Sequence, residues 1–239
     1  MSYPWRSVLP QLDEAQVESL DRLAGLLREW NTRLNLVSRR DVEELEAHHL
    51  THALLIARAV PFAPGARLLD VGTGGGLPGL PLAICYPEAR FFLCDSIEKK
   101  AKAVREMVVA LGLRNVEVVH KRAETLESRW DFILGRAVTA LPVFLGWITK
   151  NIRPGETGGV PHGVLYLKGT RYLEELEPLG LVPWQVHDLG ALHEDPYFAD
   201  KFLLHFRAEE LQACEALRPE PAPARPAKKR SKRKAPRRR

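Results

Sequence analysis

The feature that most constrains this 239-residue chain is a glycine-rich stretch, DVGTGGGLPG, at residues 70–79. An apolar run at residues 67–69 predicts the end of a buried strand, and LPLAI at residues 80–84 predicts the first turns of a helix. Glycines let the backbone approach a ligand closely, and a helix start offers unpaired N–H groups. Five glycines within eight residues exceed the need of an ordinary tight turn. The stretch therefore predicts a nucleotide-type cradle between a strand and a helix.

Two classes of ligand compete for this cradle. Gly74, Gly76 and Gly79 match G-x-G-x-x-G, and Asp95 follows about 20 residues later, as a dinucleotide site requires. Asp70, however, ends the strand directly ahead of the glycines. A carboxylate there would repel a pyrophosphate but would attract a ligand that carries an ammonium and a sulfonium group. S-adenosylmethionine is such a ligand, so the residues favour this methyl donor over a dinucleotide.

Length and composition are those of one α/β domain with additions. With 45% hydrophobic residues, the chain is long enough to bury a sizeable core. It has no apolar run near the ~18 residues of a membrane span, and residues 1–10 lack a signal-peptide core. Its cysteines, Cys85, Cys94 and Cys214, form no C-x-x-C pair, which favours a reducing cytoplasm over a disulfide framework or a cysteine-based zinc site. We expect a cytoplasmic monomer without a membrane or protein partner.

The net charge of +5 is distributed unevenly. Residues 228–239, KKRSKRKAPRRR, hold nine Lys or Arg and no acid, so the other 227 residues carry 26 basic and 30 acidic side chains and sum to −4. Alternating prolines over residues 218–226 predict an extended linker, and the basic run predicts a disordered tail. Through Lys228, Lys229, Arg230 and the cations after them, the tail would neutralise RNA phosphates. The alternative is a solubilising extension without a fixed partner.

Hydrophobic periodicity predicts the order of the elements. It predicts an amphipathic helix over residues 13–35, opened by a capping box of Asp13 and Gln16, and a second helix over residues 41–60. Alternating strands and helices follow, with strands at 67–71, 90–94, 116–120, 130–134 and 163–167 and helices at 80–85, 97–111 and 141–150. Runs at 184–189 and 201–206 predict a terminal antiparallel hairpin.

This pattern predicts an α/β fold, a mostly parallel seven-stranded Rossmann-like sheet covered on both faces, of the methyltransferase type. We divide the chain into an N-terminal helical extension (1–62), a methyltransferase domain (63–209), a short helix with a proline-rich linker (210–227) and the basic tail (228–239).

Polar side chains that follow the strands are the candidates for a site, because the carboxyl ends of parallel strands open onto the ligand crevice. Asp95, after the second strand, would accept the hydroxyls of a ribose, or would cap the following helix. Ala123 and Glu124, after the third strand, would meet an adenine ring, although a capping acid on a short helix is equally consistent. Arg136 and Lys168 would lie nearest the reactive methyl; the alternative is solvated surface charge.

Missing features narrow the reaction. The chain reads GRAVTALP after the fourth strand, without the Asn/Asp-Pro-Pro-aromatic run of amino-group methyltransferases and without a cysteine that could attack a pyrimidine carbon. The acceptor is then a ring nitrogen, a hydroxyl or a carboxylate. A purine nitrogen with a free lone pair needs no general base, so catalysis would be mostly in-line positioning. His48 and His52 have metal-chelating spacing, but nothing completes the set, which favours a polar helix face that touches substrate.

Taken together, the motifs resemble the bacterial small-subunit ribosomal RNA guanine-N7 methyltransferases, the RsmG or GidB family. The matching pieces span about residues 15–207 in the expected order: WNxxLNLVS from Trp30, the His49 region, DVGTGGGLPGLPL from Asp70, DSxxKK from Asp95, RAE from Arg122, RAV from Arg136 and LKG from Leu167. Departures exist. The family often reads HxxDS where this chain has HLTHA from His49, and Gly135 stands where a serine usually precedes RAV. The linker and tail are additions.

The resemblance implies a class I S-adenosylmethionine-dependent methyltransferase fold. It implies methyl transfer to N7 of one guanine in 16S rRNA, in a loop near the decoding centre, so the expected partner is 16S rRNA or the small ribosomal subunit. The implied roles are donor binding by Asp70, Gly72, Gly74, Leu77, Asp95, Ala123, Glu124 and Arg136, substrate contact by Asn35 and His49, and catalysis by Arg136 and Lys168.

One chemical constraint applies to that catalytic pair. Methylation leaves the guanine cationic at N7, so the two cations would hold a phosphate or the O6 edge and would not face N7. Three other functions stay open: a small-molecule methyltransferase on the same fold, a non-catalytic RNA-binding protein with a vestigial cradle, and a dinucleotide oxidoreductase, which Asp70 disfavours.

Overall fold

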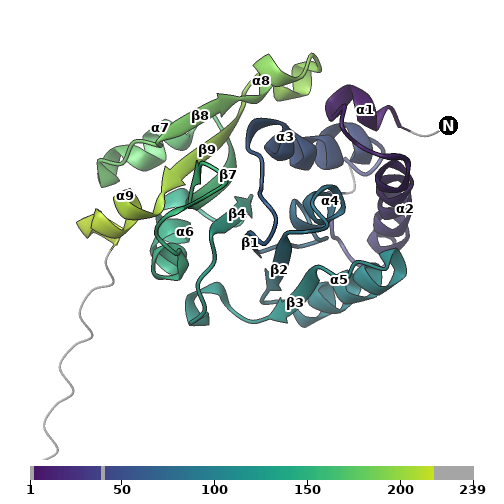
Figure 1. Cartoon of the computed structure of the whole chain (residues 1–239), viewed down its shortest axis with the longest axis horizontal. Helices are drawn as coiled ribbons and strands as arrows, with labels where there is room; N and C mark the ends of the chain where they lie inside the picture. Colours follow the sequence, from purple (N-terminus) through teal and green to yellow (C-terminus); the bar gives the residue numbers. More distant parts are fainter. Residues whose placement is uncertain (1–2, 39–40, 218–239) are drawn as a thin grey trace, which may run out of the picture.

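A seven-stranded sheet forms the centre of the molecule, in a computed structural model that describes residues 3–38 and 41–217 (Figure 1). The strand order is β3-β2-β1-β4-β7-β9-β8. These strands are β1 (Arg67–Val71), β2 (Arg90–Asp95), β3 (Val116–His120), β4 (Phe132–Arg136), β7 (Gly163–Gly169), β8 (Gln185–Asp188) and β9 (Lys201–Arg207). The first five in space are parallel, whereas β9 is antiparallel to both β7 and β8. The predicted sheet with its terminal antiparallel hairpin is therefore confirmed.

Helices cover both faces of the sheet (Figure 1). They are α1 (Trp5–Val8), α2 (Glu14–Asn31), α3 (Thr51–Ala59), α4 (Gly79–Cys85), α5 (Glu98–Leu111), α6 (Leu141–Ile148), α7 (Tyr172–Leu176), α8 (Leu189–Leu192) and α9 (Ala208–Ala213). Helices α1 to α5 pack in one hydrophobic core, which includes Leu68, and α6 and α9 pack in another, which includes Leu69. Successive strand residues point to opposite faces, so β1 and β4 bury apolar side chains on both, as Leu68 and Leu69 do in the two cores.

The N-terminal helices share the core of the sheet. The predicted capping box opens α2: the Asp13 carboxylate accepts from the Gln16 backbone N–H at 2.8 Å, and the Gln16 side chain accepts from the Asp13 N–H at 3.0 Å. The Gln16 amide also donates to the Ile84 and Cys85 carbonyls, each at 3.1 Å, at the end of α4. A single side chain thus caps one helix at its start and another at its end.

The second helix differs from its prediction. A π-helix, η1 (Leu45–Leu50), precedes α3, and no helix begins at Asp41. Leu45 and Leu50 are both fully buried. They lie five residues apart, and the wider turn of a π-helix brings positions i and i+5 to one face. Burial of these two leucines therefore favours a π-helix here, and the helix predicted to start at residue 41 begins later.

The fourth strand begins two residues later than predicted. Trp130 forms only an isolated bridge with Ile152, and the strand runs from Phe132 to Arg136. Arg136 is therefore the last residue of β4 and does not follow it. A small hairpin of β5 (Glu156–Thr157) and β6 (Val160–Pro161) was not predicted.

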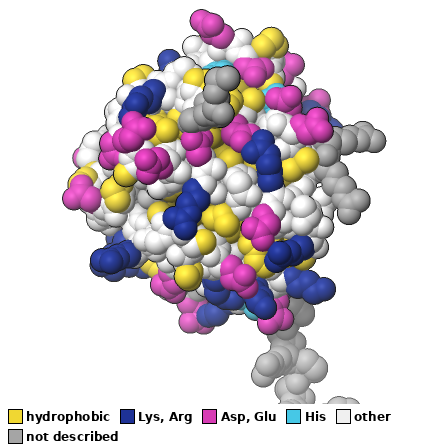
Figure 2. Space-filling model, turned by 90° about the vertical axis from the view of Figure 1, so that its right-hand side faces the viewer, with side chains coloured by type: hydrophobic (Ala, Val, Ile, Leu, Met, Phe, Trp, Pro, Cys, Tyr) yellow, Lys and Arg dark blue, Asp and Glu magenta, His cyan; other side chains and the backbone are white. Residues whose placement is uncertain are grey.

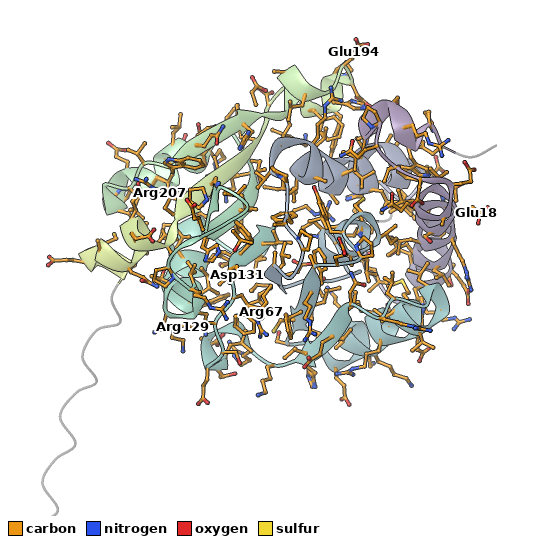
Figure 3. The ribbon with its side chains drawn as sticks, viewed as in Figure 1. Glu18, Arg67, Arg129, Asp131, Glu194 and Arg207 are labelled. Atoms are coloured by element: carbon orange, nitrogen blue, oxygen red, sulfur yellow. The ribbon has the colours of Figure 1, made fainter. Side chains whose placement is uncertain are left out.

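Asp131 closes the amino end of the central strands. Its carboxylate accepts from the Arg67 backbone N–H at 2.9 Å and from the Arg153 guanidinium at 2.7 Å. Figure 3 shows Asp131 and Arg67 beside each other where β1 and β4 start. This ion pair fills the start of β1 and β4, whereas the opposite edge, at the carboxyl ends of the strands, opens onto the two cavities that contain predicted site residues.

The face that carries α2 mixes charges of both signs. Figure 2 shows acidic and basic side chains interspersed with apolar ones, and no single-sign patch dominates that view. None of the helices in the described part of the chain combines the length and apolar character that crossing a bilayer requires.

Candidate active site

The glycine loop between β1 and α4 adopts conformations that side chains rarely tolerate. Gly72, Gly74 and Gly76 have φ angles of 67°, 58° and 85°. At Gly76, a Cβ would also lie 2.3 Å from a methyl carbon of Leu80. Glycine is therefore required both by the backbone conformation and by the close approach of α4. The predicted strand–loop–helix unit is confirmed.

Asp70 holds this loop in place through hydrogen bonds. Its Oδ2 atom accepts from the Thr73 hydroxyl at 2.6 Å and from the Gly79 backbone N–H at 2.9 Å. Only 1% of the residue is exposed, and its Oδ1 atom has no hydrogen-bond partner among the described residues. Burial raises the pKa of Asp70 to about 6, against these two hydrogen bonds and the charge of Arg136. The structure thus gives Asp70 a task inside the loop, and Asp70 lines neither of the two cavities at this edge of the sheet.

A cavity of about 570 Å³ lies above the loop. Its cationic side chains are Lys100, Arg136, Lys168 and Lys201, and Asp200 is the only carboxylate among its described lining residues. The remaining wall is formed by Leu36, Val37, Ser38, His49, His52, Gly72, Thr73, Gly74, Gly75, Leu77, Ala137, Leu167, Gly169 and Tyr197. The volume is in the range of small-molecule sites, and the charge favours an anionic ligand.

A second cavity, of about 80 Å³, shares Gly72 with the first. Its wall includes Asp95, Ala123 and Glu124, as predicted for ribose and adenine contacts, together with Val138, Trp147 and others. The Asp95 carboxylate accepts from the Gly74 N–H at 2.9 Å and from the Ile97 N–H at 2.8 Å. Asp95 thus lines the small cavity, whereas the N-cap alternative is wrong: the N-cap of α5 is Ile97, whose N–H donates to Asp95, and no side chain caps that helix.

Ala123 and Glu124 begin a 3₁₀ turn, η2 (Ala123–Thr125). Ala123 is buried, and the Glu124 carboxylate pairs with the Arg122 guanidinium at 2.6 Å. Lys150 donates to the Glu124 carbonyl at 2.8 Å. These contacts hold the 3₁₀ turn at the edge of the small cavity, where the turn contributes its backbone and the small Ala123 side chain to the cavity wall.

Apart from Asp70, the residues predicted to bind S-adenosylmethionine are divided between the two cavities: Asp95, Ala123 and Glu124 line the small one, and Gly74, Leu77 and Arg136 line the large one. The small cavity offers a carboxylate with free lone pairs for ribose hydroxyls. Gly72 lines both cavities, and a Cβ there would lie 3.0 Å from a Val138 methyl at a positive φ angle, which favours glycine. The unpartnered Oδ1 of Asp70 is a buried negative atom beneath the loop. A ligand with positive charge at this point compensates such an atom better than a pyrophosphate does.

Arg136 and Lys168 face the large cavity from neighbouring strands, as predicted. The Arg136 guanidinium donates to the His49 carbonyl at 3.3 Å, which joins β4 to η1. Burial lowers the pKa of Arg136, and the charge of Asp70 acts against this shift. Lys168 pairs with Glu175 at 2.8 Å. Next to Arg136, Ala137 has φ 53°, an unfavourable angle for alanine at the cavity wall.

Histidines line the large cavity from the N-terminal side. Neither ring nitrogen of His49 has a hydrogen-bond partner among the described residues, and the same is true of Nε2 of His52. Burial and the charge of Arg136 lower the pKa of His49 to about 4 and that of His52 well below its usual value. Both rings are therefore neutral near pH 7.

Of the residues predicted to contact the substrate or RNA, Asn35 is described by the structure and the tail residues are not. Asn35 is exposed and lines neither cavity. Asn31, four residues earlier, has a structural role instead. Its side-chain oxygen accepts from the Leu36 and Val37 N–H groups, each at 2.9 Å, and so positions two residues of the large cavity's wall. The tail candidates Lys228, Lys229 and Arg230 lie outside the described residues.

Sequence reasoning missed Tyr197 and Lys201. They lie before and at the start of β9, where register pairs Lys201 with Gly169 at the end of β7. Because β9 runs antiparallel to β7, its first residues reach the same edge as the ends of the parallel strands. The predicted hairpin already contained that signal.

Known proteins match the chain along most of its length. A family model described as GidB, rRNA small subunit methyltransferase G, matches residues 16–182. The chain is 43% identical over 196 residues to ribosomal RNA small subunit methyltransferase G of Flavobacterium johnsoniae, covering 82% of this chain and 93% of that protein. Its identity to the protein of that name from Cytophaga hutchinsonii is 41% over 197 residues, covering 82% and 95%.

Solved structures agree on the fold. That of StiE O-MT superposes with a TM-score of 0.50 at 14% identity, covering 73% of this chain and 81% of that one. At this identity the likeness concerns the architecture alone. The family model spans well over half of the chain, and the alignments include nearly the whole length of both relatives. This protein therefore belongs to the GidB family, rRNA small subunit methyltransferase G.

Proposed function

We propose that this protein transfers the methyl group of S-adenosylmethionine to N7 of one guanine in 16S rRNA, without a general base. One observation carries the proposal furthest. A small cavity with a ribose-type carboxylate, Asp95, shares Gly72 with a larger cavity whose described lining residues include four cationic side chains and one carboxylate. The first suits the nucleoside of the donor, and the second suits a polyanionic acceptor such as RNA.

The donor supplies a methyl group on a positively charged sulfur. Asp95 would hold its ribose, and Gly72 and Gly74 would let the backbone lie against it. The backbone at Ala123 would meet the adenine edge. These residues fix the direction in which the methyl points, and alignment of this kind supplies much of the rate enhancement in a displacement.

The acceptor side needs cations for binding and none for proton transfer. N7 of guanine has a free lone pair, so no residue has to remove a proton. Arg136 and Lys168 would hold a phosphate or the O6 atom, since a cation facing N7 would repel the positively charged product. The neutral rings of His49 and His52 meet the same requirement.

The test is to map the modification. Small-subunit rRNA and whole small subunits from cells that lack the methyl group are incubated with the protein and labelled S-adenosylmethionine, in parallel with a panel of small metabolites. Mass spectrometry of the RNA should find one methyl group, on N7 of a single guanine, and RNA with 7-deazaguanine there should accept none. Transfer to a metabolite instead, or to another atom of the RNA, would contradict the proposal.

A further inference from the structure

His52 is a buried polar side chain to which the proposed reaction assigns no task. It lies in the first turn of α3, faces the large cavity and is 7% exposed. Its Nε2 atom has no hydrogen-bond partner within residues 3–38 and 41–217. A buried polar atom without a partner is unfavourable, so its retention on the wall of a cavity points to a ligand that completes it.

Aromatic neighbours hold the His52 ring in place. The ring meets Phe198 edge-on, with centroids 5.6 Å apart at 67°, and Tyr197 at 6.5 Å and 88°. Tyr197 is itself fixed: His48 stacks on it at 3.8 Å and 4°, and Lys201 Nζ lies 3.6 Å from its centroid. The stacked His48 ring leaves no room for the Lys201 ammonium on the same face of Tyr197, so the two groups cover opposite faces of that ring.

Tyr197 therefore cannot offer a ring face for a nucleic-acid base to stack on. Its contribution to the cavity is to support His52. A side chain held in this way by its neighbours is preorganised, and such groups bind a ligand with little loss of conformational freedom. This distinguishes His52 from an exposed polar residue that merely borders a pocket.

The position of His52 fits the acceptor and not the donor. The adenosine-type contacts, Asp95 and Ala123, lie on the far side of Gly72, in the small cavity. His52 belongs to the part of the large cavity bounded by the N-terminal helices and the start of β9, where Arg136 donates to the His49 carbonyl. A base that accepts the methyl group has to enter beyond the glycine loop, and this is the space that remains.

Burial, aided by nearby positive charge, keeps the His52 ring neutral. Burial lowers the pKa of His52, and the positive charges of Arg136 and Lys201 lower it further, with a smaller effect of His49. A neutral imidazole can donate to an oxygen or accept from an N–H group. It also adds no repulsion toward a base that becomes cationic on methylation.

We propose that Nε2 of His52 hydrogen-bonds the edge of the acceptor guanine and so holds its N7 in line with the methyl group. This inference rests on the proposed function, because the base it names is the base that is methylated. The matching groups on guanine are the O6 acceptor and the neighbouring N1–H donor. His52 would thus contact the substrate directly, whereas Tyr197 would position His52.

Two substitutions separate the hydrogen bond from the packing. His52→Phe keeps a ring against Tyr197 and Phe198 but removes Nε2. His52→Gln places an amide near the position of Nε2 and should restore part of the interaction. His193→Phe is the matched control, because His193 also meets Phe198, at 5.1 Å, but does not line the large cavity.

The decisive measurement is binding, with RNA fragments that cannot react. One fragment carries 7-deazaguanine at the position that mapping identifies, and the other is abasic there. His52→Phe should bind the 7-deazaguanine fragment about tenfold or more weakly than wild type, as expected when a hydrogen bond is removed, and should bind the abasic fragment equally well. His52→Gln should recover most of the affinity, and binding of S-adenosylmethionine should be unchanged in all variants.

The outcomes are distinct. If His52→Phe weakens both fragments by the same factor, or neither, Nε2 does not contact the base and the inference is wrong, whatever the reaction. If the wild-type protein methylates no rRNA, the proposed function fails and takes this inference with it. A loss confined to the fragment that has the base, with the His193→Phe control unchanged, supports the inference.

Discussion

The carboxylate of Asp95, at the end of β2, accepts a hydrogen bond at 2.9 Å from the backbone N–H of Gly74, 21 residues earlier in the loop after β1. The other oxygen accepts from the Ile97 N–H at 2.8 Å. One side chain thus connects the glycine loop, the end of β2 and the start of the α5 region. The shape of the glycine loop and the proposed contact to the ribose therefore depend on the same group.

Asp95→Asn should therefore weaken binding of S-adenosylmethionine by about tenfold or more, roughly 1.4 kcal/mol. The amide keeps the size of the side chain, but its nitrogen cannot accept the hydrogen bonds that the second carboxylate oxygen accepts. Calorimetric titration with the methyl donor measures the change. Glu98→Gln, on an exposed residue in the first turn of α5, is the control. Equal affinities of Asp95→Asn and wild type would exclude a role of Asp95 in the donor site.

Gly79→Ala should destabilise the fold, because a Cβ would lie 2.9 Å from both the Asp70 Oδ2 atom and Leu93. Overpacking of this kind costs about 1–3 kcal/mol. Gly146→Ala, in the exposed part of α6 with nothing within 4 Å of the new Cβ, should instead stabilise by about 0.5–1 kcal/mol. Denaturant unfolding of both variants gives the comparison. The prediction fails if the two substitutions shift the free energy of unfolding in the same direction.

The carboxyl group of Asp70 should make stability depend on pH. Its pKa is about 6 in the folded protein, against 3.8 for an unperturbed carboxyl, chiefly through burial. A raised pKa means that the contribution to stability is complete below pH 3.8 and is lost as pH rises through 6. Two units correspond to about 3 kcal/mol.

Asp70→Asn removes this dependence. The difference in the free energy of unfolding between variant and wild type should therefore move in favour of the variant between about pH 4 and pH 7, and then level off. Unfolding curves at several pH values measure it. A difference that does not vary over this range would show that burial does not raise the pKa of Asp70.

Lys168→Ala should weaken binding of small-subunit rRNA several-fold and leave binding of the methyl donor unchanged. Lys168 lines the large cavity and pairs with Glu175, whereas Asp95 lines the small cavity. Lys168→Arg should retain most of the affinity, because the charge is kept. Lys102→Ala, at an exposed position of α5, controls for a general loss of charge. If both alanine variants lose the same affinity, Lys168 contributes no more than any other surface cation.

Removal of residues 227–239 should weaken rRNA binding and flatten its dependence on salt. The segment holds nine Lys or Arg, and the rest of the chain carries a net negative charge. Each phosphate that the tail no longer neutralises should reduce the slope of log affinity against log salt by about 0.7. Affinities at several salt concentrations, with a full-length control in which glutamine replaces the nine cations, measure the effect. An identical slope in the truncated protein would contradict it.

The sequence was most informative where local chemistry and backbone shape coincide. The glycines after β1 adopt positive φ angles that other residues disfavour. The capping box of Asp13 and Gln16 satisfies N–H groups at the start of α2 with side chains only three residues apart. Alternation of strands and helices then leaves few topologies. For these reasons the mostly parallel seven-stranded sheet, the glycine loop and the cavity positions of Asp95 and Arg136 could be predicted.

The sequence was less informative where contacts between residues far apart in the chain determine the local structure. The π-helix Leu45–Leu50 is selected by a core that needs both leucines, and no local pattern announces it. Asn35, predicted to contact the substrate, is exposed and lines neither cavity, and it is Asn31 that shapes the cavity wall. A motif gives residue types and spacing, and only packing determines which side chain turns inward.

By itself, then, the sequence determined a methyl-donor cradle on a mostly parallel sheet, because glycine conformations and hydrophobic periodicity are local properties of the chain. The tertiary structure decided how that cradle is completed. It buried Asp70 in the loop, left a nitrogen of His52 without a partner on the cavity wall, and brought Tyr197 and Lys201 to the site from the far end of the chain. Burial and long-range proximity depend on the whole packed molecule, so no single segment of the sequence contains them.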